Sequence, residues 1–125
     1  MIFLDANILL EITLKDRPHY PQVKKFLETS NDATAISMLT AHLVMHFGRK
    51  EQSDDLFLLG VIAENKLISL SPEDYMWAIT NEQGKDFEDA LQMAMAIRAG
   101  CESFVTLDAS LAKKYAGSQI NIIIL

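Results

Sequence analysis

The sequence predicts an α/β fold in which a parallel sheet is covered by helices on both faces. Short apolar runs alternate with longer helical patterns along the 125 residues, and the short runs are apolar at nearly every position. Continuous apolar strands separated by helices are typical of parallel sheets buried on both sides. No repeat, low-complexity tract or linker interrupts this alternation, so we expect residues 1–125 to form one domain.

The expected elements follow from these patterns in chain order. Apolar runs of four or five residues predict the strands, which are 2–5, 34–37, 67–70, 103–107 and 120–124. Helical periodicity predicts the helices, which are about 7–14, 20–29, 38–48, 53–65, 73–82, 87–99 and 109–115. Ser71-Pro72 is typical of a helix start, and Gly100 and Gly117 each follow a helix end. The 53–65 helix is apolar nearly all round, so we expect it to be deeply buried or partly a dimer face.

Composition and charge limit the classes of function. The net charge of −6 lacks the basic footprint of proteins that capture nucleic acid by charge alone. A bound divalent cation can reverse the local field, so a nucleic-acid substrate remains compatible with the sequence. The single cysteine, Cys101, is expected to be a small buried filler and fits a reducing, cytoplasmic setting. Neither a membrane-spanning helix nor a signal peptide is expected, because no stretch is long and apolar enough and the N-terminus has no basic start.

Aspartates follow two of the predicted strands and open one of the helices. Asp5 ends the first strand, and Asp108 follows the fourth. The carboxyl ends of central parallel strands meet at one edge of a sheet, so both side chains should reach that edge. Asp89 lies in the first turn of the helix that leads away from the same edge, and Asp86 is one turn before it. We therefore expect the four carboxylates to converge.

Taken one at a time, these aspartates have a simpler interpretation. Asp5, Asp86 and Asp108 each precede a predicted helix and could serve as N-caps. Capping alone does not account for three acids at one edge, where like charges need a compensating cation. Carboxylate oxygens with room for water suit Mg²⁺ or Mn²⁺, which can activate water and polarise a phosphoryl oxygen. The pattern indicates a metal-dependent phosphodiester hydrolase.

Three segments resemble a known family. "FLDANILL", "DFEDALQMAMAIRAG" and "FVTLD" are similar to the most recognisable segments of PIN-domain ribonucleases, especially the VapC-type toxins of bacterial toxin–antitoxin pairs. The resemblance spans essentially the whole chain, in order. It implies a three-layer α/β/α sandwich around a mostly parallel five-stranded sheet, an acidic Mg²⁺ or Mn²⁺ site and endoribonuclease activity on RNA. It also implies a homodimer and an antitoxin protein as partner.

The resemblance assigns roles to residues of this chain. Asp5, Asp89 and Asp108 match the acids of the metal site, and Asp86 stands beside Asp89 to assist directly or through water. The supporting polar residues that the match implies are Asn7, Ser37 and Thr106. The metal, rather than a side chain, would supply the nucleophile by activating water.

One position departs from the family pattern. The family usually has a glutamate in a segment like "S-x-x-x-x-E", and "ISMLTAHLVMHF" aligns Ser37 with that serine and His42 with the glutamate. A neutral imidazole carries no negative charge, so Mg²⁺ binding should be weaker and cleavage slower or absent. His46 follows His42 by one turn, so the pair could form half of a zinc or nickel site. The alternative is a partly buried, hydrogen-bonded pair, which we favour for His46, while both interpretations stay open for His42.

Two rival functions follow from these observations. One is a PIN-fold protein that binds RNA or a protein partner with weakened or absent catalysis, an interpretation that His42 favours. The other is a phosphotransfer enzyme with Asp5 as nucleophile, similar to haloacid-dehalogenase-like phosphatases. Those proteins have "D-x-D" after the first strand, whereas this chain has Asp5-Ala6-Asn7, so the second acid is missing.

Overall fold

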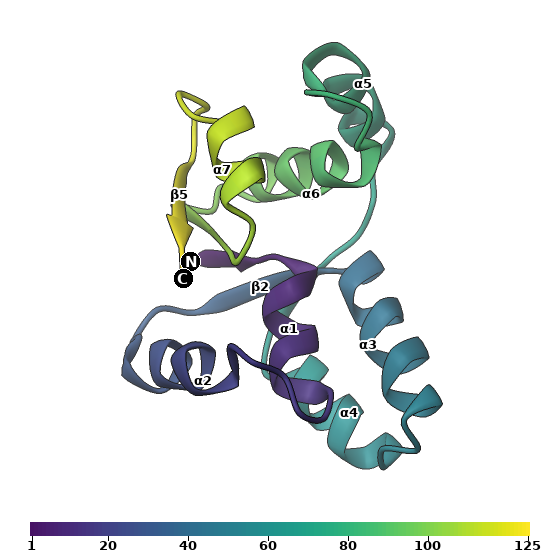
Figure 1. Ribbon diagram of the computed structural model, residues 1–125. Helices are drawn as coiled ribbons and strands as arrows, with labels where there is room; N and C mark the ends of the chain where they lie inside the picture. Colours follow the sequence, from purple (N-terminus) through teal and green to yellow (C-terminus); the bar gives the residue numbers. More distant parts are fainter.

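A five-stranded sheet divides the molecule into two helical layers (Figure 1). The computed structural model describes residues 1–125. The strands are β1 (Ile2–Leu4), β2 (Thr34–Ser37), β3 (Lys66–Ile68), β4 (Ser103–Thr106) and β5 (Asn121–Ile124). The helices are α1 (Ala6–Thr13), α2 (Tyr20–Thr29), α3 (Met38–Lys50), α4 (Asp55–Ala63), α5 (Pro72–Asn81), α6 (Phe87–Arg98) and α7 (Ala109–Lys114). The predicted α/β/α sandwich is confirmed, and every strand pair is parallel.

The strand order determines where functional side chains can meet. The order in the sheet is β3-β2-β1-β4-β5, so β1 and β4 are neighbours at the centre. The chain moves outward from β1 to β3 and then returns to the other side of β1. Ligands of open α/β sheets bind at such a reversal, beyond the carboxyl ends of the strands. Leu4 is in register with Val105, so the residues that follow β1 and β4 emerge side by side.

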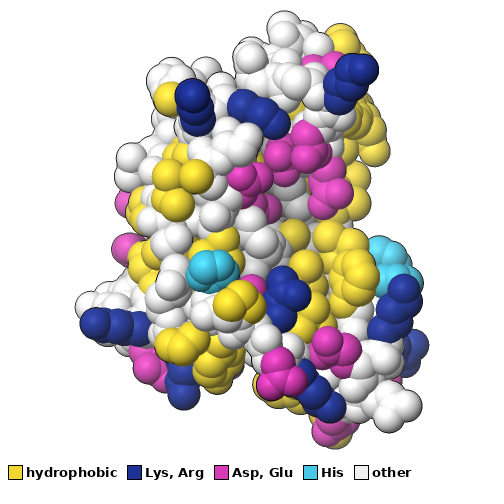
Figure 2. Space-filling model, in the orientation of Figure 1, with side chains coloured by type: hydrophobic (Ala, Val, Ile, Leu, Met, Phe, Trp, Pro, Cys, Tyr) yellow, Lys and Arg dark blue, Asp and Glu magenta, His cyan; other side chains and the backbone are white.

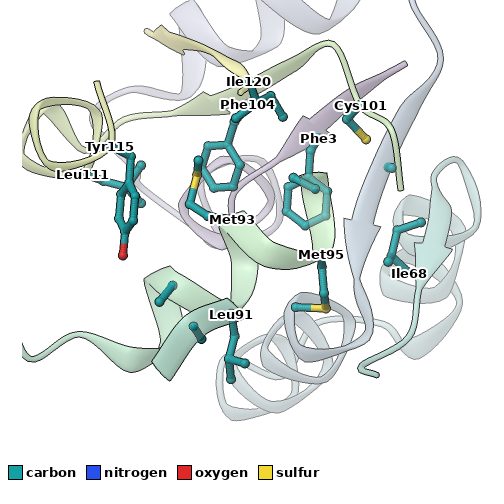
Figure 3. Packing of buried hydrophobic residues seen from close by; sticks show 14 residues of the cluster. Phe3, Ile68, Leu91, Met93, Met95, Cys101, Phe104, Leu111, Tyr115 and Ile120 are labelled. Atoms are coloured by element: carbon teal, nitrogen blue, oxygen red, sulfur yellow. The ribbon is translucent and has the colours of Figure 1, made fainter. Parts of the chain in front are cut away.

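One face of the sheet packs against α5, α6 and α7. Phe3 of β1 stacks on Phe104 of β4 with ring centroids 5.4 Å apart. Figure 3 shows Met93 and Met95 of α6 pointing into the same layer, so both methionine side chains fill the core. Cys101 is buried here too, and burial raises the pKa of its thiol, as expected of an unreactive filler.

The opposite face packs against the four helices α1 to α4. Leu4 and Ile36 of the sheet contact a cluster to which α4 contributes Leu58 and Ile62. Gly48 of α3 lets α4 come close, because a Cβ atom there would lie 2.6 Å from a methyl carbon of Leu58. The other side of α4 is exposed, with Leu56 77% accessible. Of the two expectations for this helix, deep burial is therefore wrong.

The structure corrects several predicted boundaries by one or two residues, for local reasons. β1 ends at Leu4 because Asp5 already serves as the N-cap of α1. The helix predicted at 53–65 begins at Asp55, because the Asp54 side chain accepts a hydrogen bond from the Leu56 N–H. The strand predicted at 67–70 is Lys66–Ile68, and Ser71 caps α5 in a capping box with Asp74. None of the helices has the length and apolar character needed to span a lipid bilayer.

A buried ion pair links α5 to the end of α6. The Asp74 side chain is only 1% exposed. It accepts hydrogen bonds from Nε and Nη2 of Arg98, at 2.8 and 2.9 Å, and from the Ser71 N–H at 2.8 Å. Arg98 Nη2 also donates to the carbonyl of Ser69. This pair fixes the angle at which α5 lies over α6.

Replacing Arg98 should be costly for stability. In Arg98→Met the Asp74 carboxylate stays buried without its cation, so the free energy of unfolding should fall by about 3 kcal/mol. Urea denaturation followed by circular dichroism measures the change. The matched control is Arg49→Met, which breaks the exposed pair between Arg49 and Asp55 and should change stability far less. Equal losses in the two variants would contradict this account.

Candidate active site

Asp5 is held in place by groups of α1 and of the central strand β4. Its side chain is buried, with 6% of the residue exposed. Oδ1 accepts a hydrogen bond from the Ala6 N–H at 2.7 Å, which makes Asp5 the N-cap of α1. Oδ2 accepts from the Thr106 hydroxyl at 2.7 Å and from Nδ2 of Asn7 at 3.1 Å. The carboxylate is therefore fixed in position at the carboxyl end of β1.

Thr106 and Asn7 connect Asp5 to the segment that carries Asp108. The Thr106 hydroxyl oxygen accepts from the Asp108 N–H at 3.0 Å while its proton is donated to Asp5. Asn7 Nδ2 donates to the same hydroxyl oxygen at 3.1 Å, and its Oδ1 accepts from the Leu107 N–H at 3.2 Å. The two residues predicted to support the site thus join the ends of β1 and β4.

The predicted capping roles of the other aspartates are also present. Asp108 Oδ1 accepts from the N–H groups of Ser110 and Leu111 at the start of α7, at 2.9 and 3.2 Å. Asp86 Oδ1 accepts from the Asp89 N–H at the start of α6, at 3.2 Å. Oδ2 of Asp108 and both carboxylate oxygens of Asp89 accept no hydrogen bond from an N–H or hydroxyl group of the chain. Capping therefore leaves oxygens free.

Two of the aspartates, Asp89 and Asp5, have raised pKa values. The pKa of Asp89 is raised to about 7, first by burial and then by the charges of Asp86, Asp5 and Asp108. Burial raises the pKa of Asp5 as well; hydrogen bonds from Thr106 and Ala6 oppose the rise, and the charges of Asp108 and Glu88 add to it. Figure 2 shows acidic side chains gathered in the upper half of the face in view, bordered by lysine or arginine side chains. Asp86, Asp5 and Asp108 are therefore near enough to Asp89 for their charges to raise its pKa.

The donor set suits a hard divalent cation. The carboxylates of Asp5, Asp89 and Asp108 come from the ends of two strands and the start of one helix, and burial and neighbouring charges disfavour the ionised forms of Asp5 and Asp89 when no compensating charge is present. Mg²⁺ and Mn²⁺ prefer such oxygen ligands. As the side chains stand, no three of the Asp, Glu, His and Cys residues are close enough together to form a complete metal site. Coordination would therefore require the free oxygens of Asp89 and Asp108 to close toward Asp5.

Two residues near the site were not expected from the sequence. Glu88 contributes to the field at Asp5, and the glutamate between the two aspartates of "DFED" is the signal that could have identified it. Gln92, one turn after Asp89, is 1% exposed and donates from Nε2 to the Thr40 hydroxyl at 3.2 Å. Its Oε1 is buried without a partner. Ser37 is placed in the same network, because its hydroxyl caps α3 through the Thr40 N–H.

His42 is not brought to the carboxylates. The buried face of α3 carries Thr40, Ala41, Val44 and Gly48, and His42 lies about 160° around the helix from Thr40. It is exposed in a hollow lined with Met45, His46, Arg49 and Lys50, which contains no acid. The expectation of a partly buried, hydrogen-bonded pair is wrong, because both imidazoles are exposed and stack with centroids 6.1 Å apart. No third ligand completes a zinc or nickel site around them.

Solved structures with the same fold come from toxin–antitoxin systems. A toxin–antitoxin complex from Klebsiella pneumoniae is similar over 98% of this chain and 96% of that one, with a TM-score of 0.76 and 20% identity. VapC20 from Mycobacterium tuberculosis, a sarcin-ricin loop cleaving toxin, matches over 90% and 94% with a TM-score of 0.73 and 11% identity. VapBC2 from Rickettsia felis, bound to a DNA fragment from its promoter, matches over 100% and 99% with a TM-score of 0.67 and 19% identity. At these identities the likeness establishes the fold.

The amino-acid sequence itself matches a family. No curated protein sequence matches the chain significantly. The sequence model of the PIN domain, however, matches residues 2–117. The match covers nearly the whole chain and includes all the aspartates described above, so the chain belongs to the PIN domain family.

Proposed function

We propose that this protein is a metal-dependent endoribonuclease that acts in the cytoplasm as the toxin of a toxin–antitoxin pair. The observation that carries the proposal is the group of Asp5, Asp89 and Asp108 at the sheet edge where α/β proteins bind ligands, because burial and the charge of Asp108 both raise the pKa of Asp5 and of Asp89. Such a group is unfavourable for a purely structural site, because each ionised carboxylate raises the free energy of the others. A cation between them removes that cost.

In the proposed site each residue has a distinct task. Asp5, Asp89 and Asp108 hold the ion, which is Mg²⁺ or Mn²⁺. Thr106 and Asn7 keep the Asp5 carboxylate turned toward the site through their hydrogen bonds. Asp86 assists beside Asp89, directly or through water. When bound, the cation supplies an activated water and neutralises charge on the phosphoryl oxygen.

The proposed partners follow from family membership and from the surface. The toxin–antitoxin structures that share this fold suggest an antitoxin protein that masks the site. Exposed apolar side chains offer an antitoxin or a second copy of the chain a surface to cover, and they include Leu56, Phe57 and Leu59 on α4 and Met76 and Ile79 on α5. We propose a homodimer on this ground.

A second candidate function is an RNA- or protein-binding PIN domain with weakened or absent catalysis. It is favoured by α3, which supplies no acid from Met38 to Lys50 and directs His42 outward. The side of α3 that faces α6 is marked by Thr40, which contacts Gln92, and by Leu39, which packs against the α6 cluster. Leu43 lies about 60° around the helix from Thr40, so it too is on the face of α3 that is turned toward α6.

Removing an aspartate should abolish metal binding without unfolding the chain. Asp5→Asn and Asp108→Asn each keep a side chain that can still accept a hydrogen bond, and each removes one charged ligand. Calorimetric titration of metal-stripped protein with Mn²⁺ should give affinities at least about tenfold below wild type, and RNA cleavage should be lost. The control is Asp32→Asn, an exposed aspartate before β2 at the opposite edge of the sheet. Undiminished cleavage in both site variants would refute the proposal.

Metal binding should weaken as the pH falls. With a pKa of about 7, Asp89 is mostly protonated at pH 6 and mostly ionised at pH 8. Since the ion needs the ionised carboxylate, Mn²⁺ affinity should drop about tenfold between pH 8 and pH 6. In metal-free protein the raised pKa has the opposite consequence for stability, which should fall as the pH rises from about 4 to about 7. Asp89→Asn should remove most of that fall, and a wild-type affinity that is flat from pH 6 to pH 8 would contradict the assignment.

A pair of α3 variants separates the two candidate functions. If the protein fails to cleave RNA because α3 supplies no acid, Leu43→Glu should strengthen Mn²⁺ binding and produce cleavage, because residue 43 lies on the face of α3 that points toward α6. His42→Glu, on the outward face, should leave both unchanged. A gain in His42→Glu alone would instead support the alignment of His42 with the family glutamate. Strong cleavage by the wild-type protein would reject the binding-only function.

A further inference from the structure

A polar hollow is lined by residues of α5, α6 and α7 and of the loop before β5. It has a volume of about 310 Å³, which falls at the lower end of the range for small-molecule sites. Its walls include Trp77 and Asn81 of α5, Gln83 after that helix, Lys114 and Tyr115 at the end of α7, and Gln119 before β5. We refer to it as the amide hollow, because three of these side chains are amides.

The amide hollow adjoins the candidate active site through Tyr115. This residue is 5% exposed, and its ring lies in the core layer shown in Figure 3. Burial raises the pKa of Tyr115, and the charges of Asp89 and Asp86 add to the rise, so those carboxylates are its neighbours. The Tyr115 hydroxyl also accepts a hydrogen bond from the Gln83 N–H at 3.4 Å. A ligand in the hollow would therefore contact a tyrosine that lies within the field of Asp89 and Asp86.

Lys114 is directed toward the same place. A Cβ atom at Gly84 would lie 3.6 Å from its Nζ, so the ammonium group reaches over the loop that leads to Asp86. Gly84 has a φ of +74°, and the resulting turn carries the chain from Gln83 to the start of α6. A positive group between the hollow and the carboxylates is suitably placed for an anion that spans the two, such as a phosphate.

The remaining walls suit a flat heterocycle with polar edges. Trp77 is half-buried and stacks on Tyr115, with centroids 6.3 Å apart and planes 30° apart, so an apolar ring face borders the hollow. The amides of Gln83 and Gln119 each offer a donor and an acceptor side by side, and Asn81, whose Nδ2 donates to the Trp77 carbonyl at 2.9 Å, offers its Oδ1 as an acceptor. Aromatic faces stack on bases, and amides pair with base edges. Ring face, amides and ammonium group together match a nucleotide.

We propose that the amide hollow binds one nucleotide of a single-stranded RNA, with its base against Trp77 and its phosphate on Lys114, next to the phosphate to be cleaved. The inference rests on the proposed function, because it assumes that RNA is the substrate. It extends that function by adding a set of RNA-binding residues that are separate from the aspartates of the candidate active site. It also indicates that sequence preference arises at this position, through the three amides.

Trp77 is the only tryptophan in the chain, so its fluorescence reports on the hollow directly. The probe is a mixed-sequence 2′-O-methyl RNA hexamer, titrated into the full chain in EDTA and low salt, so that metal-dependent cleavage plays no part. Binding should change the emission of Trp77 on excitation at about 295 nm. A fluorescein-labelled copy of the hexamer gives the overall affinity independently by anisotropy.

Two neighbouring lysines provide a matched pair of variants. Lys114→Gln removes the ammonium group that lines the hollow and should weaken hexamer binding about tenfold. Lys113→Gln removes an equal charge from the adjacent exposed residue, which does not line the hollow, and should weaken binding less than about twofold. The double variant Asn81→Ala with Gln119→Ala should reduce binding and preserve the folded circular dichroism spectrum, since both residues are exposed.

The outcomes separate this inference from the proposed function. Hexamer binding by anisotropy with an unchanged Trp77 emission, or with equal effects of the two lysine variants, would overturn the hollow as a nucleotide site. Absence of hexamer binding in both measurements would overturn it as well. Neither result bears on cleavage, which the aspartate variants test separately. A response of Trp77 that Lys114→Gln weakens would support the inference even if the protein cleaves no RNA.

Discussion

The hydrogen bond from the Thr106 hydroxyl to Asp5 is the contact on which the site depends. It joins the ends of the two central strands, and the same hydroxyl accepts from the Asp108 N–H. The Thr106 hydroxyl oxygen therefore orients Asp5, fixes the turn after β4 and places Asp108 where it can cap α7. Parallel pairing of β1 with β4 brings these groups together, and the apolar strands that make the pairing stable are buried on both faces.

The site combines favourable and unfavourable roles for the same residues. As caps, Asp5, Asp86 and Asp108 stabilise the helices that follow them. As neighbours, the carboxylates raise the pKa of Asp89 to about 7 and make the fully ionised group unfavourable. A site that is stable locally but strained electrostatically is what a cation-binding function requires, because the cation then contributes the missing charge.

The sequence predicted the fold well because its signals are local. Apolar runs mark the five strands, and the capping residue Ser71 with Pro72 marks the start of α5. That the charges of Asp5 and Asp108 reach Asp89 could also be predicted, because strand ends and helix starts share an edge in a parallel sheet. The orientation of His42 could not be predicted in this way. The helix α3 contains no acid to fix the alignment with the family, and the alignment alone does not show which face of the helix His42 occupies. Gln92 and the amide hollow arise from tertiary packing between distant elements, which leaves no periodic trace in the sequence.

The small helix α7 has its own mechanical consequence. At six residues it is about 9 Å long, with Asp108 at one end and Lys114 and Tyr115 at the other. A rigid rod of this length transmits a tilt at its cap to its far end. A displacement of Asp108 toward an ion would thus shift the groups that border the amide hollow. A ligand in the hollow would in turn shift Asp108. Thermodynamic linkage makes that influence equal in both directions, so α7 would couple ion and nucleotide as partners in a single binding equilibrium.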